Sequence, residues 1–454
     1  MEKNAQRNII DEPADVKDSM DEIADKAMFG EKKPEWKPER RNMKLIKIAA
    51  AGVALAVVIA VIIAVVLSQN QGNCETNGAT NCATSESDTA DTSEAGAGEQ
   101  KMSMALAAGS VTATIDGKSV TYKGAYVVDG ISVEVTAGTF ESSGEDEAVF
   151  LVVNGGSLKI DGNILVNKTG AENFSGRGDE YSFYGINSAV VVVGEGSSVS
   201  VNGATIQTSV GGANVVVATN GGTAVVENTT ITTTVNSSRG LHATYGGKIN
   251  ADTVNISTQG GSCAALATDR GAGTVVATNM MLSTAGAGSP LIYSTGDITV
   301  TNSKGTATGA QIAVVEGKNS INMQGCDFAA TGVGNRKSGE SVIDNAGVMI
   351  YQSMSGDASV GKGSFTATDT TLSLKSDAAD YATTPMFFVT NTEASVTLTG
   401  TTLNFSSEAK FMSAMGTSEW GRSGANGGTV SVSLSDVTAT NREIYVDDIS
   451  NVSF

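Results

Sequence analysis

The chain has 454 residues, enough for two or three ordinary domains or one long repetitive domain. Its 53 glycines and 5% aromatic residues leave few large side chains for a thick globular core. A formal net charge of −19 argues against a general nucleic-acid-binding protein. The one histidine, His242, excludes any mechanism or zinc site that needs two imidazoles.

The first 47 residues carry 11 basic and 11 acidic side chains and precede a long apolar segment. Residues 48–67, IAAAGVALAVVIAVIIAVVL, contain no charge and no proline. As a helix they would span about 30 Å, the thickness of the hydrocarbon core of a bilayer. A signal peptide would start closer to residue 1 and end at a small-residue cleavage site. We therefore expect a retained transmembrane helix rather than a cleaved signal or a buried core helix.

The charges on either side of this segment predict its orientation. Seven Lys and Arg residues lie between positions 32 and 47, whereas the next basic residue after the segment is Lys101. The positive-inside rule then places the tail 1–47 in the cytoplasm, beside anionic lipid headgroups, and exports everything after residue 67. The exported part holds 18 basic and 37 acidic residues, an excess that favours solubility over the capture of cations or basic partners.

Residues 68–104 are rich in Ser, Thr, Ala, Asn, Gly and Glu and predict a flexible exported linker. Cys74 and Cys82 lie in it, where a disulfide is allowed; separate or intermolecular thiols remain an alternative. Cys263 and Cys326 lie inside the repeats described below and are expected to be small buried residues. No CxxC motif occurs, so no metal and no cofactor are predicted.

Residues 105–454 repeat a short pattern. GSSVSVNGATIQT begins at Gly196, GGTAVVENTTITT at Gly221 and GGKINADTVNIST at Gly246, so the openings are 25 residues apart. Each segment has a turn, a strand of alternating apolar residues, a corner of Asn, Asp, Gly or Thr, and a second strand. A third apolar stretch precedes several turns, as at Val215–Ala218 and Leu241–Ala243.

Three short strands in a repeat of about 25 residues predict an all-β fold, a parallel β-helix. One rung cannot bury its apolar face alone, whereas stacked rungs share one narrow core of Val, Ile, Ala and Thr. About 13 or 14 rungs would form a rod of about 60–65 Å. A propeller blade needs about 40 residues, and a β-sandwich does not repeat its turns in sequence.

The stretch SRGLHATYGGKINADTVNISTQGGSCAALATDRGAGTVVATNMMLSTAGAGS, residues 238–289, resembles right-handed parallel β-helix passenger domains of adhesin-type autotransporters and pectate-lyase-like bacterial surface proteins. The resemblance covers about residues 105–445 and implies a right-handed, single-stranded solenoid that contacts carbohydrate or other cells. No segment resembles an outer-membrane barrel or a wall-sorting signal, so the resemblance concerns the passenger architecture.

Catalytic signatures are weak. The Asn-Thr-Asp, Asp-Asp, Gly-His-Gly and Arg-Ile-Lys set of polygalacturonases is absent, and the basic residues that might serve a lyase are scattered: Arg177, Arg239, Arg270, Arg336, Lys337 and Arg422. A glycosidase needs only two carboxylates at the right separation, and such a pair across rungs stays open. His242, next to Leu241 and Ala243 in a strand, is expected to face solvent.

Candidate ligand-binding residues come from insertions that interrupt the repeat, because insertions in a solenoid form surface loops. They are residues 168–184, 333–341 and 408–427, and they concentrate aromatic side chains that a narrow core does not need. Arg177-Gly178-Asp179 spells RGD, a three-residue match that chance explains better than selection. The alternative is that these aromatic rings brace their own loops. The candidates are Phe174, Arg177, Asp179, Tyr181, Tyr184, Arg336, Trp420 and Arg422.

The sequence therefore favours a single-pass bacterial membrane protein that displays a β-helix for adhesion or surface-glycan binding. Its expected partners are membrane lipid and an extracellular polysaccharide, or a glycan or protein on a host or neighbouring cell. The first alternative is a membrane-tethered polysaccharide lyase or glycoside hydrolase, which the missing catalytic sets disfavour. The second is a structural spacer, which the aromatic insertions disfavour.

Overall fold

The computed structural model describes residues 106–335, 337–338, 341–353, 357–417 and 427–454. Within these residues no helix is long and apolar enough to cross a membrane. The predicted tail 1–47, transmembrane segment 48–67 and linker 68–104, with Cys74 and Cys82, lie outside the described residues. All the described residues lie within the predicted β domain, 105–454.

The alternation of apolar and polar residues folds into strands with one buried face. In β15 (Lys248–Asp252) the side chains of Ile249 and Ala251 are buried, and the three residues between and beside them are exposed. Equivalent residues of successive rungs pair in register, so Val199, Ala224 and Ile249 form one inward column at intervals of 25 residues. A slip of one residue would turn every apolar side chain outward, so the pattern fixes the register.

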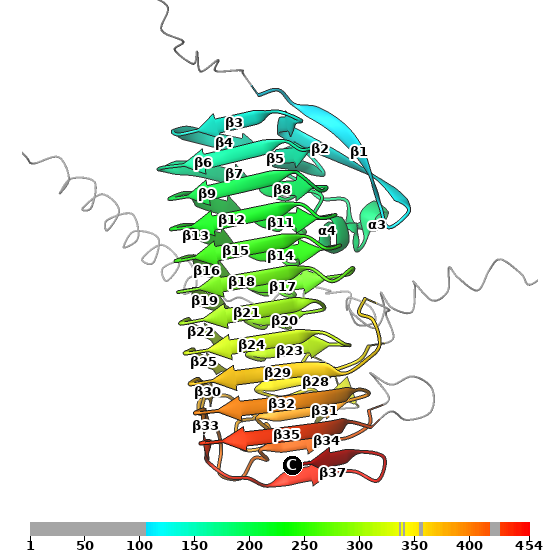
Figure 1. The fold of residues 1–454 in the computed structure, drawn as a ribbon, viewed down its shortest axis with the longest axis vertical. Coiled ribbons are helices and arrows are strands. Elements are labelled where there is room, and N and C mark those ends of the chain that lie inside the picture. The colour runs from blue at the N-terminus through cyan, green and yellow to red at the C-terminus, as the bar shows by residue number, and fades with distance from the viewer. Residues whose placement is uncertain (1–105, 336, 339–340, 354–356, 418–426) are drawn as a thin grey trace, which may run out of the picture. The chain divides into compact units, whose positions relative to one another are not determined.

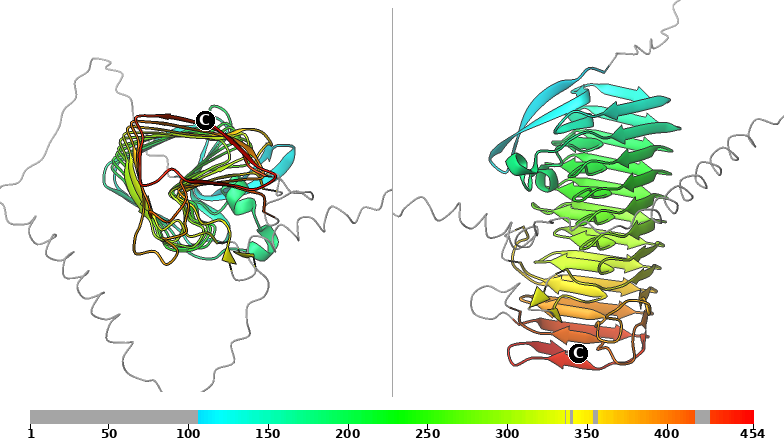
Figure 2. Two further views of the ribbon diagram at one scale, coloured as in Figure 1. Left: turned by 90° about the horizontal axis from the view of Figure 1, so that it is seen from below. Right: turned by 180° about the vertical axis from the view of Figure 1, so that it is seen from behind.

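Three strands per repeat build three long sheets, here called sheets A, B and C, which have 13, 12 and 11 strands among the described residues (Figures 1 and 2). All neighbours within them are parallel except β1 and β2, which form an antiparallel hairpin at the start of sheet A. This architecture is consistent with the predicted parallel β-helix, and the prediction of three short strands per unit is confirmed.

The strands of sheet A, in order, are β1 (Gly109–Ile115), β2 (Lys118–Asp129), β5 (Glu147–Val153), β8 (Val190–Val193), β11 (Val216–Thr219), β14 (Leu241–Thr244), β17 (Leu266–Asp269), β20 (Ile292–Ser294), β23 (Ala313–Glu316), β28 (Val348–Tyr351), β31 (Phe387–Thr390), β34 (Met412–Ala414) and β37 (Ile444–Val446).

The strands of sheet B are β3 (Ser132–Val135), β6 (Ser157–Asp161), β9 (Ser198–Asn202), β12 (Thr223–Glu227), β15, β18 (Thr274–Thr278), β21 (Asp297–Thr301), β24 (Ser320–Gln324), β29 (Gly363–Thr368), β32 (Glu393–Thr399), β35 (Thr429–Ser435) and β38 (Asn451–Ser453).

The strands of sheet C are β4 (Gly138–Ser142), β7 (Ile164–Lys168), β10 (Thr205–Thr208), β13 (Thr230–Thr233), β16 (Asn255–Thr258), β19 (Met281–Thr284), β22 (Lys304–Ala307), β25 (Asp327–Ala330), β30 (Thr371–Leu374), β33 (Thr402–Asn404) and β36 (Thr438–Ala439). Outside the three sheets lie the helices α3 (Phe174–Arg177) and α4 (Glu180–Tyr184) and the hairpin of β26 (Lys337–Ser338) and β27 (Ser341–Val342).

The corner between sheets B and C has one residue with positive φ in each of ten successive rungs. These residues are Gly162, Gly203, Asn228, Thr253, Asn279, Asn302, Gly325, Asp369, Gly400 and Asp436. Glycine, asparagine and aspartate adopt this conformation at low cost, which explains the predicted Gly and Asn corners. Thr253, at φ 58°, is a β-branched exception that its neighbours must hold in place.

The interior is one continuous cluster that runs from Val128 to Val437. It contains more aromatic residues than the sequence suggested: Phe365, Phe387 and Phe411, from successive rungs, pack edgewise or tilted against one another with ring centroids 5.8 and 5.4 Å apart. Phe411 was expected in a surface insertion, but it is 2% exposed. The premise that a narrow core does not need aromatic rings is therefore wrong.

Sheet A differs from the other two because both of its faces are covered. Every residue of β8, β11, β14, β17, β23, β28 and β31 is buried. On the outer face, the β1–β2 hairpin and α4 cover the next strands of the sheet, where Tyr122, Tyr181 and Tyr184 join an apolar cluster with Val191 and Val217. A second outer cluster, around Met349 and Phe388, covers the later strands.

Shortening an inward aromatic side chain tests this core. Phe365→Ala should lower the free energy of unfolding by about 3–5 kcal/mol, because the cavity lies between two rungs that cannot close independently. The matched control on the outward face of the same sheet is Val276→Ala, which should change the unfolding free energy by less than about 0.5 kcal/mol. Urea unfolding followed by circular dichroism measures both; equal effects would contradict the assigned register.

Candidate functional site: a polar network on the outer face of sheet A

The predicted insertion 168–184 forms α3 and α4, and its two tyrosines are buried rather than displayed. Tyr181 is 0% and Tyr184 3% exposed. The Tyr181 hydroxyl contacts the Asp146 carboxylate, and the Tyr184 ring stacks on Tyr245 at 5.6 Å. Phe174 remains 37% exposed, with its ring packed edgewise on Tyr181 at 4.7 Å. These two tyrosines therefore brace the insertion and offer no open ring face.

The RGD tripeptide spans the end of α3 and the start of α4. The Arg177 guanidinium lies 3.2 Å from Asp146 and 3.0 Å from Glu180. Asp179 occupies the N-cap position of α4. An arginine held by two carboxylates of its own chain would have to leave both before it could bind a partner.

Arg336, Trp420 and Arg422 lie outside the described residues. Cys263 and Cys326 are buried and free, as expected. His242 is 0% exposed, so its prediction as a surface residue is wrong. Its side chain does point away from the core, but α4 lies over that face of sheet A.

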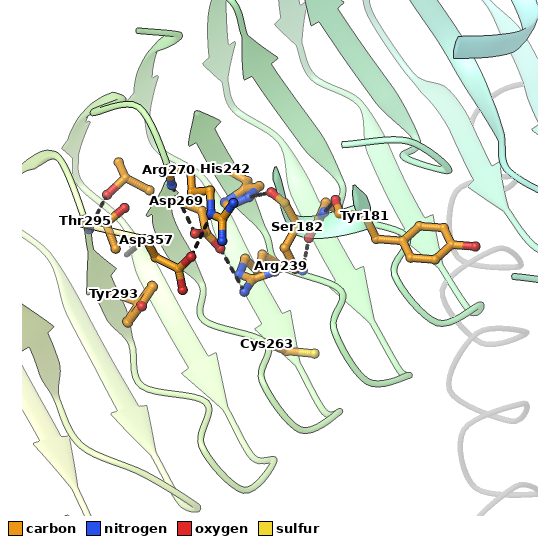
Figure 3. A network of polar contacts seen from close by, with 12 residues as sticks. Tyr181, Ser182, Arg239, His242, Cys263, Asp269, Arg270, Tyr293, Thr295 and Asp357 are labelled. Atoms are coloured by element: carbon orange, nitrogen blue, oxygen red, sulfur yellow. Dashed lines mark hydrogen bonds and ion pairs between the residues drawn. The ribbon is translucent and has the colours of Figure 1, made fainter. Parts of the chain in front are cut away.

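A polar network lies on this outer face, between the two apolar clusters (Figure 3). It begins with Ser182 of α4, which accepts a hydrogen bond of 2.6 Å from Arg239 at its hydroxyl. Arg239 also approaches Asp269, at the end of β17, at 3.4 Å. Arg270 follows on the chain, pairs with Asp357 at 2.7 Å, and places its guanidinium 3.8 Å from the centre of the Phe183 ring.

Glu316, at the end of β23, is another buried carboxylate on this face, besides Asp269 and Asp357. Tyr293 and Tyr351 donate their hydroxyls to it at 2.6 and 2.8 Å, and Ser353 donates as well. The strand register places Thr295 between Asp269 and Glu316, because Ala267 pairs with Tyr293 and Ser294 with Val315. Two rungs separate the carboxylates, so their Cα atoms lie about 10 Å apart.

Burial sets the ionisation of these groups. Burial raises the pKa of Asp269 to about 7. The Arg239 guanidinium acts against this increase, and the Asp357 and Glu316 carboxyls add to it. Burial also raises the pKa of Glu316, although the hydroxyls that donate to it favour its ionised form. Neighbouring carboxyl groups whose pKa values lie above the usual range are common at functional sites.

His242 is held in one protonation state. Its Nε2 atom lies 2.6 Å from the backbone oxygen of Ser182, which can only accept, so Nε2 carries the proton. Burial and the positive charge of Arg239 lower the pKa of His242 to about 3, so the ring is neutral near pH 7. Its Nδ1 atom is a buried acceptor with no hydrogen-bond partner among the described residues.

The network is partly open to solvent. The side chain of Arg270 is 32% exposed and that of Arg239 12%, whereas Asp269 and Asp357 are only 6% and 7% exposed. Tyr293 and Phe183 are half-buried. Fixed guanidinium donors, carboxylate acceptors and aromatic rims are the groups that bind sugar hydroxyls and ring faces. Among the described residues no group of three or more His, Cys, Asp or Glu side chains could hold a metal ion.

The sequence carries one signal for this site. Strands of sheet A end in small or apolar residues in several rungs, as in VVVV and VVAT, but β17 ends LATD and β23 ends AVVE. An acidic residue at the same outward repeat position in two rungs marks a patch on one face. Arg239 and Arg270 stand out in the sequence only as scattered basic residues.

The single histidine permits a direct test of this geometry. In protein labelled with ¹⁵N-histidine, the imidazole should keep the Nε2–H tautomer and show no titration between pH 5 and 8. An exposed histidine would titrate near pH 6.5. The folded state should also lose stability as the pH falls from about 6.5 toward about 3, because the unfolded state binds the proton first. A midpoint near 6.5 in the folded protein would contradict the burial of His242.

Comparisons with protein-family models, with curated proteins and with solved structures return no match for this chain. The assignment of a function therefore depends on the geometry of the outer face of sheet A and on the charge and hydropathy of the segments before it.

Proposed function

We propose that this protein is a membrane-anchored, right-handed β-helix that binds glycans at the polar network of sheet A and so mediates adhesion at the cell surface. The half-open network of Arg239, Arg270 and Tyr293 over buried carboxylates is the observation that carries the proposal. The 20 uncharged residues 48–67 and the basic residues before them support the anchor. We propose a right-handed coil because connections between parallel strands of one sheet are almost always right-handed.

The network is suited to sugars because its groups are already fixed before any ligand arrives. Asp357 and the Phe183 ring hold Arg270, and Ser182 and Asp269 hold Arg239. A ligand that binds there orders few new side chains, which lowers the entropic cost of binding. Arg239 pairs with Asp269 and Arg270 with Asp357, and the Glu316 carboxylate lies on the same face, so a neutral glycan fits this balance of charge better than a strongly acidic one.

Hydrolysis of the bound glycan is the second candidate. It is favoured by the two buried carboxyls, Asp269 and Glu316, which flank Thr295 on one outward column. Inverting glycosidases place their two carboxyl groups about 6.5–9.5 Å apart and keep one of them protonated. Glu316 already accepts three hydroxyl hydrogen bonds, however, and this makes binding the better-supported function.

A glycan panel tests both candidates. The full chain should retain a neutral polysaccharide without shortening it, and Arg270→Ala should weaken binding at least tenfold, about 1.4 kcal/mol. Lys248→Ala, on the exposed face of sheet B, is the control and should bind like the unmodified chain. The binding site would be refuted if Arg270→Ala retained the polysaccharide as well as the unmodified chain does. It would also be refuted if the full chain retained nothing on the panel.

Shortened chains would instead establish hydrolysis. Glu316→Gln and Asp269→Asn should then abolish the shortening while the protein remains folded by circular dichroism. If Asp269 is the proton donor, the rate should fall as the pH rises through about 7, where this carboxyl loses its proton.

A further inference from the structure

Five successive strands of sheet B carry an uncharged polar face. They are β21, β24, β29, β32 and β35, and in each of them inward apolar residues alternate with outward polar ones. The two outward residues at the end of each strand read Thr-x-Thr in β21, β29 and β32, Asn-x-Gln in β24 and Ser-x-Ser in β35. Every one of these side chains can form hydrogen bonds without carrying a charge.

The strand register arranges these side chains as two straight columns, here called the polar grid. One column is Thr299, Asn322, Thr366, Thr397 and Ser433, and the other is Thr301, Gln324, Thr368, Thr399 and Ser435. Neighbouring rungs lie about 4.8 Å apart, and residues two apart on one strand lie about 6.6 Å apart. The pairing continues without a shift through the five strands, which lie one above another in Figure 1, so the grid keeps these two spacings throughout.

The threonine hydroxyls of the grid are directed outward and are not used by the fold. All the side chains of the grid are half-buried or exposed. Within the described residues its threonine hydroxyls make no hydrogen bond, whereas those of Thr370 and Thr401, at the next corner, donate to backbone carbonyls at 2.8 and 3.0 Å. Because β-branched side chains have restricted χ1 angles, the methyl and hydroxyl groups of the grid are fixed before any partner arrives.

The absence of charge in the grid contrasts with the rest of this chain, whose formal net charge is −19. Lys159, Glu227 and Asp252 occupy the same two columns on strands nearer the N-terminus. A charge also lies beside the grid, where Lys362 donates to Ser431 in the neighbouring column at 2.9 Å. An ionic crystal or a nucleic acid would need charged groups, and sugar faces would need aromatic rings, and the grid has neither. It therefore fits a neutral partner.

We infer that the polar grid binds the surface of ice. A partner that engages every rung of such a grid must itself repeat at the same spacings. Hydrogen-bonded water oxygens lie about 2.8 Å apart, so in a tetrahedral network two oxygens that share a neighbour lie about 4.5 Å apart. The layers of hexagonal ice repeat at about 1.6 times that distance, about 7.3 Å. The grid spacings of about 4.8 and 6.6 Å agree with these two repeats to within about a tenth.

Rigid repetition makes weak contacts sufficient. One hydroxyl contributes only about 1 kcal/mol and would not hold the protein on a surface that liquid water also wets. The hydroxyls of five paired strands leave an ice surface only together, because the sheet fixes them relative to one another. The inference goes beyond the proposed glycan binding, which uses sheet A, and it does not depend on it.

Slow freezing of the full chain in detergent micelles tests the inference, because growing ice rejects solutes that do not bind it. We expect the chain to enter the ice, while micelles without protein are rejected. Thr366→Tyr with Thr397→Tyr should lower the incorporated fraction by about tenfold, since two rings above the grid hold the other hydroxyls away from the surface. The matched control is Thr232→Tyr with Ser257→Tyr, two half-buried outward residues on paired strands of sheet C, and it should enter the ice normally. Unfolding midpoints verify that both variants fold.

Access to the grid can be measured separately. In a Thr366→Cys variant the new thiol should react with a maleimide as fast as an exposed cysteine does, whereas Cys263, which is 0% exposed, should not react. Peptide mapping distinguishes the two sites. A protected thiol at position 366 would show that another part of the chain covers the grid, and this would overturn the proposal.

The remaining outcomes decide between ice and other partners. Exclusion of the full chain from ice, or equal incorporation of the two tyrosine variants, would refute ice binding. Retention on microcrystalline cellulose that Thr366→Tyr with Thr397→Tyr removes, without incorporation into ice, would assign the grid to a solid polysaccharide instead. Glycan retention at sheet A should be unchanged in that double variant, so failure of the proposed function and failure of this inference can be told apart.

Discussion

The apolar side chains inside the three sheets lose contact with water only when the next rung lies over them. A rung of about 25 residues has no core of its own, so its stability comes from its two neighbours. This constraint explains the strict inward columns such as Val199, Ala224 and Ile249, and the positive-φ residue that recurs at one corner.

The same constraint leaves the outward faces free to vary, and sheet A uses this freedom. Its outward side chains are apolar over the first strands and again around Met349 and Phe388, where other segments cover them, and polar in between. The polar stretch is stabilised by partners from distant parts of the chain, such as Asp357 for Arg270 and Ser182 for His242. A face of this kind combines rigidity from the sheet with chemical variety from the covering segments, and this combination makes it the best candidate for ligand binding.

The sequence predicted the part of the fold that depends on local periodicity. Residues such as Ile249 and Ala251 alternate with polar neighbours, and their burial needs only the adjacent rung. The sequence did not predict what covers sheet A, because that depends on segments far along the chain. His242 and Ser182 are 60 residues apart, and Arg270 and Asp357 are 87 apart. Tyr181 and Tyr184 were interpreted as ligand-binding for the same reason: nothing in their own segment shows that the outer face of β8 and β11 will bury them.

The direction of the backbone hydrogen bonds has a mechanical consequence. Bonds between rungs run along the axis of the stack, so a force that pulls its two ends apart acts on them in series. A terminal rung, which has one neighbour, should give way first, and the others should follow in order. Each released rung of about 25 residues would add about 80–90 Å of extended chain. A protein built in this way would lengthen in many small steps under load, and so would absorb a sudden pull without releasing what its ends hold.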